Sequence, residues 1–457
     1  MLIRNLIYIL QLNLYDIGSF LKFAYTHPAW WRLEKRATIT WTKKAKLVYV
    51  VTIFFLIAII GCAYFQLGFS GLGVIFFEII MLPAIISFAT VSVYPIDKYL
   101  KGRLVKKAKL ILRRYVQGVT VIGITGSYGK TSTREILASI LGEKFRVFKL
   151  EENINTDIGI ADYIVKNPDF LESKEVFIVE MGAYKKGDIK DLCDLVSPDY
   201  SILTGINESH LERFGSLENT IQAKFELPLA TKKMAVLNFK DENVKNNFSK
   251  FDLKNSVGVT DEAAQEIKIL DNFLGLEFKL NDRIFKTKLL AGHNIPLILL
   301  CLEIAGALGM DSEAMAKGVE KISYIPHRLE PIYNDKTDVW VIDDSYNGNF
   351  NGIISGLEVL GRARGRRIVL TPGLVELGKK TEKVHNNIGQ LYADQGVDLV
   401  LLIKNKATKY IVSGLKERGF ENYKIFDSSN QAHAALPEII QRGDTIIFQN
   451  DLPDNYF

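Results

Sequence analysis

The chain has 457 residues, of which 48% are hydrophobic and 24% charged, and its formal net charge is +5. This length exceeds what a single compact core accommodates, so two or three domains are expected. The sequence has no low-complexity tract and no internal repeat, which excludes fibrous, repeat and wholly disordered proteins.

The charge is distributed unevenly along the chain. Residues 1–114 carry a net charge of +12, and the remainder carries −7. A basic segment beside apolar runs is typical of a chain that meets an anionic membrane surface, and the acidic remainder argues against nucleic acid as a partner. The three cysteines, Cys62, Cys193 and Cys301, give no disulfide framework, so a reducing compartment is expected for the soluble part.

The first 25 residues are apolar but are interrupted by polar and charged residues such as Arg4 and Asp16. A secretory signal needs an unbroken apolar stretch and a small-residue cleavage site, and neither is present. The pattern predicts an amphipathic helix over about residues 1–25 that lies on the membrane, with Trp30 and Trp31 as interfacial anchors.

Two long apolar runs follow. Leu47–Leu67 contains no charge, and Val74–Ile96 is interrupted only by Glu78. A helix needs about 20 apolar residues to cross a bilayer, so a transmembrane hairpin is predicted with helices over about 46–67 and 72–96. Lysines and arginines flank both outer ends, which predicts an inner (cytoplasmic) membrane protein with both termini and the catalytic domains in the cytoplasm. A buried core hairpin is the alternative interpretation.

From about residue 109, short β-rich runs alternate with helical stretches. The runs VTVIGIT, VFIVEM, YSILTGI and MAVLNF are typical of buried strands in a mostly parallel sheet, with TREILASILG and ENTIQAKFELPLA as helices. After the segment SYIPHRLEPIY comes a second series, VWVIDDS, RIVLTPG, LVLLIK and TIIFQND. The predicted fold class is α/β, with a membrane-anchoring region (1–108), a central parallel-sheet domain (109–325) and a smaller Rossmann-like C-terminal domain (326–457).

The segment VTVIGITGSYGKTSTREIL combines a strand, a glycine loop and the start of a helix. Gly126 and Gly129 let backbone N–H groups approach phosphate oxygens. Lys130 adds positive charge, and the Thr131 hydroxyl can bind Mg²⁺. The strict pattern has a glycine at position 124, where this chain has Ile124. Because the flanking strand and helix are both in place, the central domain is predicted to be a P-loop ATPase domain.

The spacing GxTGxxGKT is that of the Mur ligases, which join amino acids to cell-wall precursors, and the chain resembles this family over roughly residues 110–390. The run from VEMGAYKKGD to QAKFEL is similar to the central domain of the branch that adds D-alanyl-D-alanine. The motifs AGHNIP, PHRLEP, VIDDSYNGN and LVELG continue the match in order. The resemblance implies an ATP-dependent ligase of peptidoglycan synthesis that forms an amide bond.

Glu180 ends the strand VFIVE, at the edge where α/β sheets bind ligands. With His210 it is suited to hold a divalent cation that bridges ATP and substrate oxygens, and the family pattern around both favours this role. Lys224, in QAKFEL, matches the lysine that in these ligases carries a carbamate and supports a second Mg²⁺. A solvated helix lysine is the alternative for Lys224.

The resemblance also assigns residues to ATP and to the substrate. His293 and Asn294 border the adenine, Arg328 reaches the phosphates from the linker, and Asp344 holds the ribose. The set expected to bind ATP is Thr125, Gly126, Ser127, Tyr128, Gly129, Lys130, Thr131, Ser132, His293, Asn294, Arg328 and Asp344. The residues expected to hold metal are Thr131, Glu180, His210 and Lys224. The residues expected to contact substrate are Asn155, Thr156, Tyr346, Asn347 and Asn349. The residues expected to act in catalysis are Lys130, Lys224, Arg328 and His210.

The implied reaction has two steps. The γ-phosphate of ATP passes to a substrate carboxylate to give an acyl phosphate, and the incoming amine then displaces phosphate to form the amide. Mg²⁺, Lys130 and Arg328 offset the developing charge. The C-terminal domain must close over the nucleotide, so the PHRLEP linker is the expected hinge.

Three features depart from the family pattern. The membrane-anchoring region stands in place of a small domain that grips UDP, Leu297 replaces the second asparagine after GHN, and FQNDLPDNY replaces a basic segment near the C-terminus. The acceptor is therefore either a UDP-linked muramoyl peptide or a lipid-linked precursor. The added group is an amino acid or a dipeptide such as D-alanyl-D-alanine, and membrane lipids are further partners.

Two other functions compete with this interpretation. A ligase that extends a poly-amino-acid polymer is disfavoured by the DDSYNGN and LVELG stretches. A nucleotide-dependent membrane scaffold is disfavoured because the expected phosphate- and metal-binding residues are all present.

Overall fold

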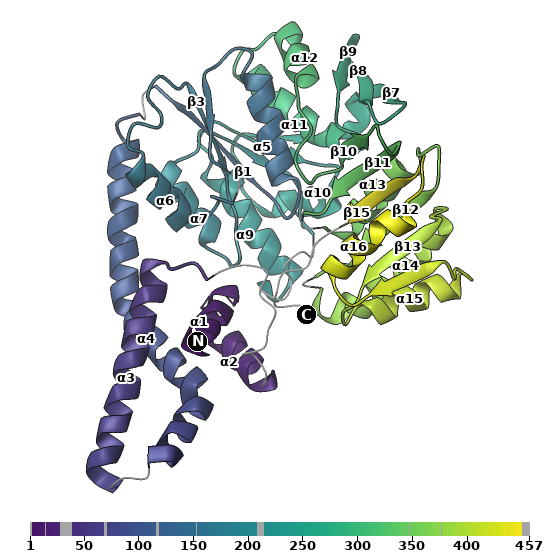
Figure 1. Cartoon of the computed structure of the whole chain (residues 1–457). Coiled ribbons are helices and arrows are strands. Elements are labelled where there is room, and N and C mark those ends of the chain that lie inside the picture. Colours follow the sequence, from purple (N-terminus) through teal and green to yellow (C-terminus); the bar gives the residue numbers. More distant parts are fainter. Residues whose placement is uncertain are drawn as a thin grey trace. The chain divides into compact units, whose positions relative to one another are not determined.

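The computed structural model describes residues 2–449 apart from position 14 and residues 28–38, 68–70, 116–117, 152, 208–213, 347 and 376. The chain divides into an N-terminal unit, Met1–Leu104, and a larger unit, Val105–Leu452 (Figure 1). The expected anchors Trp30 and Trp31 lie outside the described residues.

Two long apolar helices form most of the N-terminal unit. α3 spans Lys43–Leu67 and α4 spans Gly71–Leu112, so α4 continues well past the predicted end at residue 96. The segments Lys43–Ala63 and Ile79–Leu112 are long and apolar enough to cross a membrane, with mean hydropathies of 2.4 and 2.0.

The segment expected to form one interfacial helix forms two, α1 (Leu2–Leu12) and α2 (Ile17–Thr26). The break falls at Tyr15, whose φ of 63° is left-handed, and at Asp16, whose carboxylate caps α2 by accepting the Ser19 N–H at 2.7 Å. The apolar side of α1 packs against α3 and α4 in one core that includes Leu6, Ile7, Leu10, Ala45, Val48, Leu82 and Ile86. The prediction of one continuous helix over residues 1–25 was therefore wrong, and protein side chains cover the apolar face of α1.

A six-stranded parallel sheet forms the centre of the larger unit, in the order β2-β3-β1-β4-β5-β6. Its strands are β1 (Thr120–Thr125), β2 (Val147–Lys149), β3 (Val176–Glu180), β4 (Tyr200–Leu203), β5 (Met234–Asn238) and β6 (Ser256–Val259). The four runs predicted as buried strands are β1, β3, β4 and β5, which confirms the parallel α/β sheet. Because β1 lies between β3 and β4, the loops after these three strands meet at one edge.

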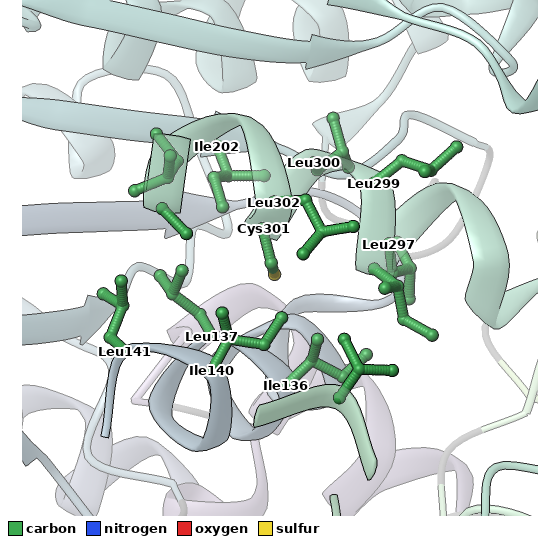
Figure 2. Packing of buried hydrophobic residues seen from close by; sticks show 14 of the residues in the cluster. Ile136, Leu137, Ile140, Leu141, Ile202, Leu297, Leu299, Leu300, Cys301 and Leu302 are labelled. Carbon is green, nitrogen blue, oxygen red and sulfur yellow. The ribbon is translucent and has the colours of Figure 1, made fainter. Parts of the chain in front are cut away.

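Helices cover both faces of this sheet (Figure 1). The helices of this domain are α5 (Lys130–Leu141), α6 (Asp157–Lys166), α7 (Asp188–Val196), α9 (Leu217–Ala230), α10 (Glu242–Asn247), α11 (Asn294–Ala307) and α12 (Ser312–Glu320). On one face Ile202 packs with α5 and α11, whose facing leucines and isoleucines surround Cys301 (Figure 2). On the other face Leu203 and Leu237 pack with Phe225 of α9, as expected because strand side chains alternate between faces.

A small antiparallel sheet of β7 (Gln265–Leu270), β8 (Gly275–Leu280) and β9 (Arg283–Thr287) adds to the first of these cores. The C-terminal domain follows, with a second sheet in the order β10-β11-β15-β12-β13-β14 in which only β10 is antiparallel. Its elements are β10 (Glu330–Asn334), β11 (Val339–Asp344), α13 (Phe350–Leu360), β12 (Arg367–Thr371), α14 (Thr381–Asp394), β13 (Leu399–Ile403), α15 (Thr408–Glu417), β14 (Tyr423–Phe426), α16 (Ser429–Ile439) and β15 (Thr445–Gln449).

The helix that follows the glycine loop, α5, is held by a close approach to α12. A Cβ atom added at Gly318 would lie 2.6 Å from the Ile140 Cα atom. The Ser139 hydroxyl also donates to the Gly318 carbonyl at 2.8 Å. The two backbones can approach this closely only because position 318 has no side chain.

We expect Gly318→Ala to lower the free energy of unfolding by about 1–3 kcal/mol, because α12 must move away from α5. Gly306→Ala is the matched control within α11, where the new Cβ would meet the Met315 side chain at an ordinary 3.6 Å. That change should be neutral or stabilising by up to about 1 kcal/mol, since alanine is the better helix former. Urea unfolding of the detergent-solubilised chain measures both, and equal stabilities of the two variants would contradict the expectation.

Candidate functional site

The glycine loop joins the end of β1 to the start of α5. Gly129 precedes α5 with a left-handed φ of 74°, and a Cβ atom there would lie 3.3 Å from the Leu297 side chain. Leu297 is 3% exposed, so the residue that departs from the family pattern packs beneath the loop. The loop therefore depends on glycine at this position both for its backbone angle and for space.

Tyr128 fixes the middle of the loop to the neighbouring elements. Its hydroxyl donates to the Asp241 carboxylate at 2.6 Å, and Asp241 also accepts the backbone N–H groups of Ile206 (3.1 Å) and Val244 (2.8 Å). Burial and the nearby carboxylate raise the pKa of Tyr128 far above its ordinary value, so the phenol stays protonated and donates. The Thr204 hydroxyl donates to the Tyr128 carbonyl. Neither Asp241 nor Thr204 was predicted, because each follows a strand without belonging to a motif.

Lys130 lies at the first residue of α5 and turns back toward the loop. Its ammonium donates to the Gly126 carbonyl at 2.9 Å. Burial lowers the pKa of Lys130, the Glu180 carboxylate opposes this effect, and the positive charge of Arg328 adds to it. The linker arginine is thus close enough to the loop lysine for their charges to interact.

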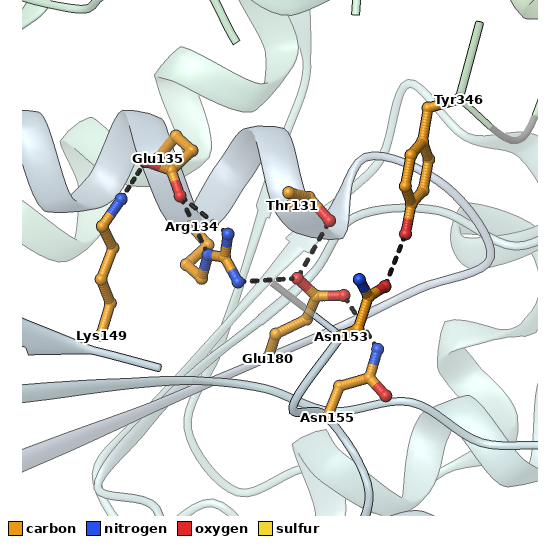
Figure 3. A network of polar contacts seen from close by, with 8 residues as sticks. All are labelled: Thr131, Arg134, Glu135, Lys149, Asn153, Asn155, Glu180 and Tyr346. Atoms are coloured by element: carbon orange, nitrogen blue, oxygen red, sulfur yellow. Dashed lines mark hydrogen bonds and ion pairs between the residues drawn. The ribbon is translucent and has the colours of Figure 1, made fainter. Parts of the chain in front are cut away.

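Three side chains contact the Glu180 carboxylate, which lies at the end of β3 (Figure 3). It accepts the Thr131 hydroxyl at 3.0 Å and the Asn155 amide at 3.3 Å, and an Arg134 guanidinium nitrogen lies 3.6 Å away. Three residues expected at the metal and substrate sites, Thr131, Glu180 and Asn155, are therefore together. Arg134 was missed, although it lies three residues after Thr131 and hence on the same helix face.

Lys224 projects from α9 and is 3% exposed. Burial lowers the pKa of Lys224 well below its ordinary value, and the charge of Lys130 lowers it further. Nearby carboxylates, Glu180 among them, act in the opposite direction. The lysine is therefore a buried group near the loop and not the solvated helix lysine considered as its alternative. His210 lies outside the described residues.

The linker and the C-terminal domain contribute the remaining residues. The Arg328 guanidinium lies over the Tyr346 ring, 4.2 Å from its centroid. Burial raises the pKa of Asp344 to about 7, and Arg328 opposes this shift. The Tyr346 hydroxyl donates to Asn153 of the central domain at 2.9 Å (Figure 3). Arg328, Asp344 and Tyr346 thus form one group at this side of the site.

The side chains of most other expected site residues cap helices or donate hydrogen bonds to backbone carbonyls. Thr156 accepts the Gly159 N–H and caps α6, and Asn349 accepts the Gly352 N–H and caps α13. Three further side chains donate to backbone carbonyls: Thr125 to Met181, Ser127 to Asn207 and Asn294 to Ala291. Ser132 lies in the first turn of α5, and His293 precedes α11 with an exposed side chain. Asn347 lies outside the described residues.

Two family models match the chain. The Mur ligase middle domain matches residues 124–305, and the glutamate ligase domain of the Mur ligases matches residues 327–449. The first match contains the glycine loop, Glu180 and Lys224, and the second contains Arg328 and Asp344. The chain therefore belongs to the Mur ligases, and it is an ATP-dependent ligase that forms C–N bonds.

Individual relatives narrow the resemblance to one member of the family. The UDP-N-acetylmuramoyl-tripeptide–D-alanyl-D-alanine ligase of Bacillus subtilis (strain 168) is 27% identical over 347 residues, which is 74% of this chain and 75% of that protein. The ligase of the same name from Escherichia coli (strain K12) is 26% identical over 68% of this chain and 71% of that protein. The crystal structure of the MurF ligase from Thermotoga maritima in complex with ADP has a TM-score of 0.66 at 24% identity, and the match covers 77% of this chain and 80% of that one. The fold is thus that of MurF.

We expect Lys224→Met to raise the free energy of unfolding of the metal-free protein at pH 7 by about 1–3 kcal/mol, because a buried amine is replaced by an apolar group of similar size. The pKa of Lys224 is lower in the folded than in the unfolded chain, so the unfolded chain binds more protons and stability rises with pH. The gain should therefore shrink as the pH rises toward 10. Unfolding curves at several pH values measure it, with Lys233→Met, an exposed lysine, as the control. A loss of stability at pH 7 would contradict the expectation.

Proposed function

We propose that the chain adds D-alanyl-D-alanine to a UDP-linked muramoyl tripeptide with the energy of ATP, as the names of its relatives state for those proteins. The observation that carries the proposal is the position of Arg328, which comes from the linker and lies over the Tyr346 ring, 4.2 Å from its centroid. Its charge shifts the pKa values of Lys130 in the loop and of Asp344 in the C-terminal domain. Arg328, Lys130 and Asp344 are the residues that the family resemblance assigns to the phosphates and the ribose.

The roles of the chain's own groups follow from their chemistry. Loop N–H groups between Gly126 and Thr131 bind phosphate oxygens, as at other helix N-termini, apart from the Ser127 N–H, which donates to the Gly205 carbonyl. Lys130 and Arg328 stabilise the charge that develops as the γ-phosphate passes to the substrate carboxylate. The incoming amine then attacks the acyl carbon, the C–N bond forms and phosphate leaves. Asn155 orients the substrate beside Glu180, and its hydrogen bond to that carboxylate supports this role.

The donor set around Glu180 fits Mg²⁺. The Thr131 hydroxyl and the Glu180 carboxylate are hard oxygen donors that lie 3.0 Å apart and approach one point beside the loop. When bound there, the ion supplies positive charge to the phosphate oxygens. His210 and a carbamate on Lys224 complete the proposed metal-binding set. The buried amine of Lys224 favours the neutral form, which is the form that reacts with carbon dioxide.

We expect the purified full chain, given ATP, Mg²⁺, UDP-linked muramoyl tripeptide and D-alanyl-D-alanine, to add one dipeptide to each acceptor, as mass spectrometry can detect. Lys130→Ala should lower turnover by at least about 10³-fold, because a charge aimed at the transferring phosphate is lost. Lys166→Ala, which removes an exposed lysine paired with Asp162, should leave turnover unchanged.

The same assay is run in parallel with a lipid-linked acceptor, and three outcomes would contradict the proposal. Extension of a lipid-linked acceptor alone would reject the UDP-linked acceptor. Repeated additions to one acceptor would indicate a polymer-extending ligase. Nucleotide binding without turnover on any acceptor would indicate a scaffold.

The N-terminal unit is proposed to anchor this activity at the cytoplasmic face of a membrane. In the apolar window of α3 only 17% of the residues are buried, and Phe54 and Ile57 are each about two-thirds exposed. A surface with this many exposed large apolar side chains is stable in contact with lipid tails but unfavourable in water. At the basic ends of the helices, the Asp97 carboxylate lies 3.3 Å from the Lys44 ammonium and 2.9 Å from the Lys101 ammonium, so its negative charge is neutralised.

We expect the chain to stay in the membrane pellet after an alkaline carbonate wash. Phe54→Glu combined with Ile57→Glu should release part of it, because each carboxylate at mid-membrane costs about 2–3 kcal/mol. The matched control is Lys22→Glu combined with Tyr25→Glu, two exposed positions on α2. Release of the unaltered chain by the wash would reject the membrane anchor.

A further inference from the structure

We propose that Tyr346 is a positioning residue that couples docking of the C-terminal domain to the presentation of Arg328. This inference rests on the proposed function, because it gives Arg328 its role at the phosphates. It differs from the expectation that Tyr346 contacts the substrate.

Two contacts of one side chain carry the inference. The face of the Tyr346 ring holds the Arg328 guanidinium, whose Cζ atom lies 4.2 Å from the ring centroid. The hydroxyl at the other end of the same ring donates to the Asn153 side chain at 2.9 Å, and Figure 3 shows the ring pointing at Asn153. A rigid aromatic side chain therefore spans from the linker arginine to the central domain.

The central-domain end of this link leads directly to the site. Asn153 has a left-handed φ of 70°, which asparagine tolerates better than most residues. Two residues later, Asn155 donates its amide to the Glu180 carboxylate at 3.3 Å. The segment that receives the Tyr346 hydroxyl is thus the segment that contacts the proposed metal-binding carboxylate.

The backbone on both sides of Arg328 has a costly conformation, so contacts with other residues must hold it in place. His327 and Leu329 both have left-handed backbones, with φ of 58° and 52°, on either side of Arg328. Such angles are costly for residues other than glycine and persist only where the surroundings enforce them. The His327 ring is held by the Asp343 carboxylate at 2.7 Å, and the Tyr346 N–H lies 3.4 Å from the His327 carbonyl. These contacts fix the linker backbone, and the Tyr346 ring then fixes the direction of the arginine side chain.

The experiment separates the two contacts. Tyr346→Phe keeps the ring under Arg328 and loses the hydroxyl, whereas Tyr346→Leu loses both. Asn153→Gly removes the acceptor without straining the left-handed backbone, and Asn153→Asp keeps an acceptor oxygen. Tyr333→Phe is the control, because the Tyr333 hydroxyl bonds to Asp338 within the C-terminal domain.

We expect Tyr346→Phe and Asn153→Gly each to raise the KM for ATP about threefold to tenfold, with a small effect on kcat, since each loses one exposed hydrogen bond that holds the domains together. The double variant should be no worse than either single variant, because both remove the same bond. Tyr346→Leu should also lower kcat by tenfold or more, since Arg328 is then no longer directed at the phosphates. Asn153→Asp should have the KM for ATP of the unaltered chain, and Tyr333→Phe should change neither the KM nor kcat.

A second readout does not depend on turnover. Fluorescence energy transfer between dyes on the central and C-terminal domains, titrated with a non-hydrolysable ATP analogue, reports the nucleotide concentration at which the domains dock. Equal shifts of this midpoint for Tyr346→Phe, Asn153→Gly and the double variant would support the coupling even if the proposed acceptor proves wrong. Additive effects of the two single changes, or unchanged kinetics and midpoint in Tyr346→Leu, would overturn it while leaving the ligase assignment intact.

Discussion

The Glu180 carboxylate is the group on which the arrangement of the site depends. It is 5% exposed at the end of a fully buried strand, and a charge in that position is tolerated only with partners. Those partners come from separate segments: Thr131 and Arg134 from α5, and Asn155 from the stretch before α6. Satisfying one buried charge therefore fixes the relative positions of the phosphate loop and the substrate-binding segment.

The larger unit follows closely from local sequence patterns. Every apolar run that predicted a strand of either sheet forms one. A strand that is buried on both faces of a sheet is apolar along its whole length, and these runs have that pattern. The N-terminal segment was less predictable. Its break at Tyr15 and Asp16 depends on a capping carboxylate, and its packing against α3 and α4 depends on tertiary contacts that periodicity does not report.

Motif residues of the site were predictable, whereas the residues that support them were not. Lys130, Thr131 and Glu180 follow from a loop and a strand end whose chemistry is local. Arg134, Asp241 and Asn153 act through contacts with residues distant in sequence, which no spacing rule gives. Thr156 and Asn349 also cap helices with the side chains expected to bind substrate, a local role that the family motif does not indicate.

The hydrogen bond between Lys130 and the Gly126 carbonyl has a consequence for discrimination among ligands. A ligand that engages this ammonium must replace an acceptor that the loop itself provides. A neutral hydroxyl or amide offers nothing stronger than the carbonyl it displaces, whereas an anionic oxygen forms a charge-assisted bond of roughly twice the strength. The loop thus competes with its own ligand, and only a group with negative charge gains from the exchange.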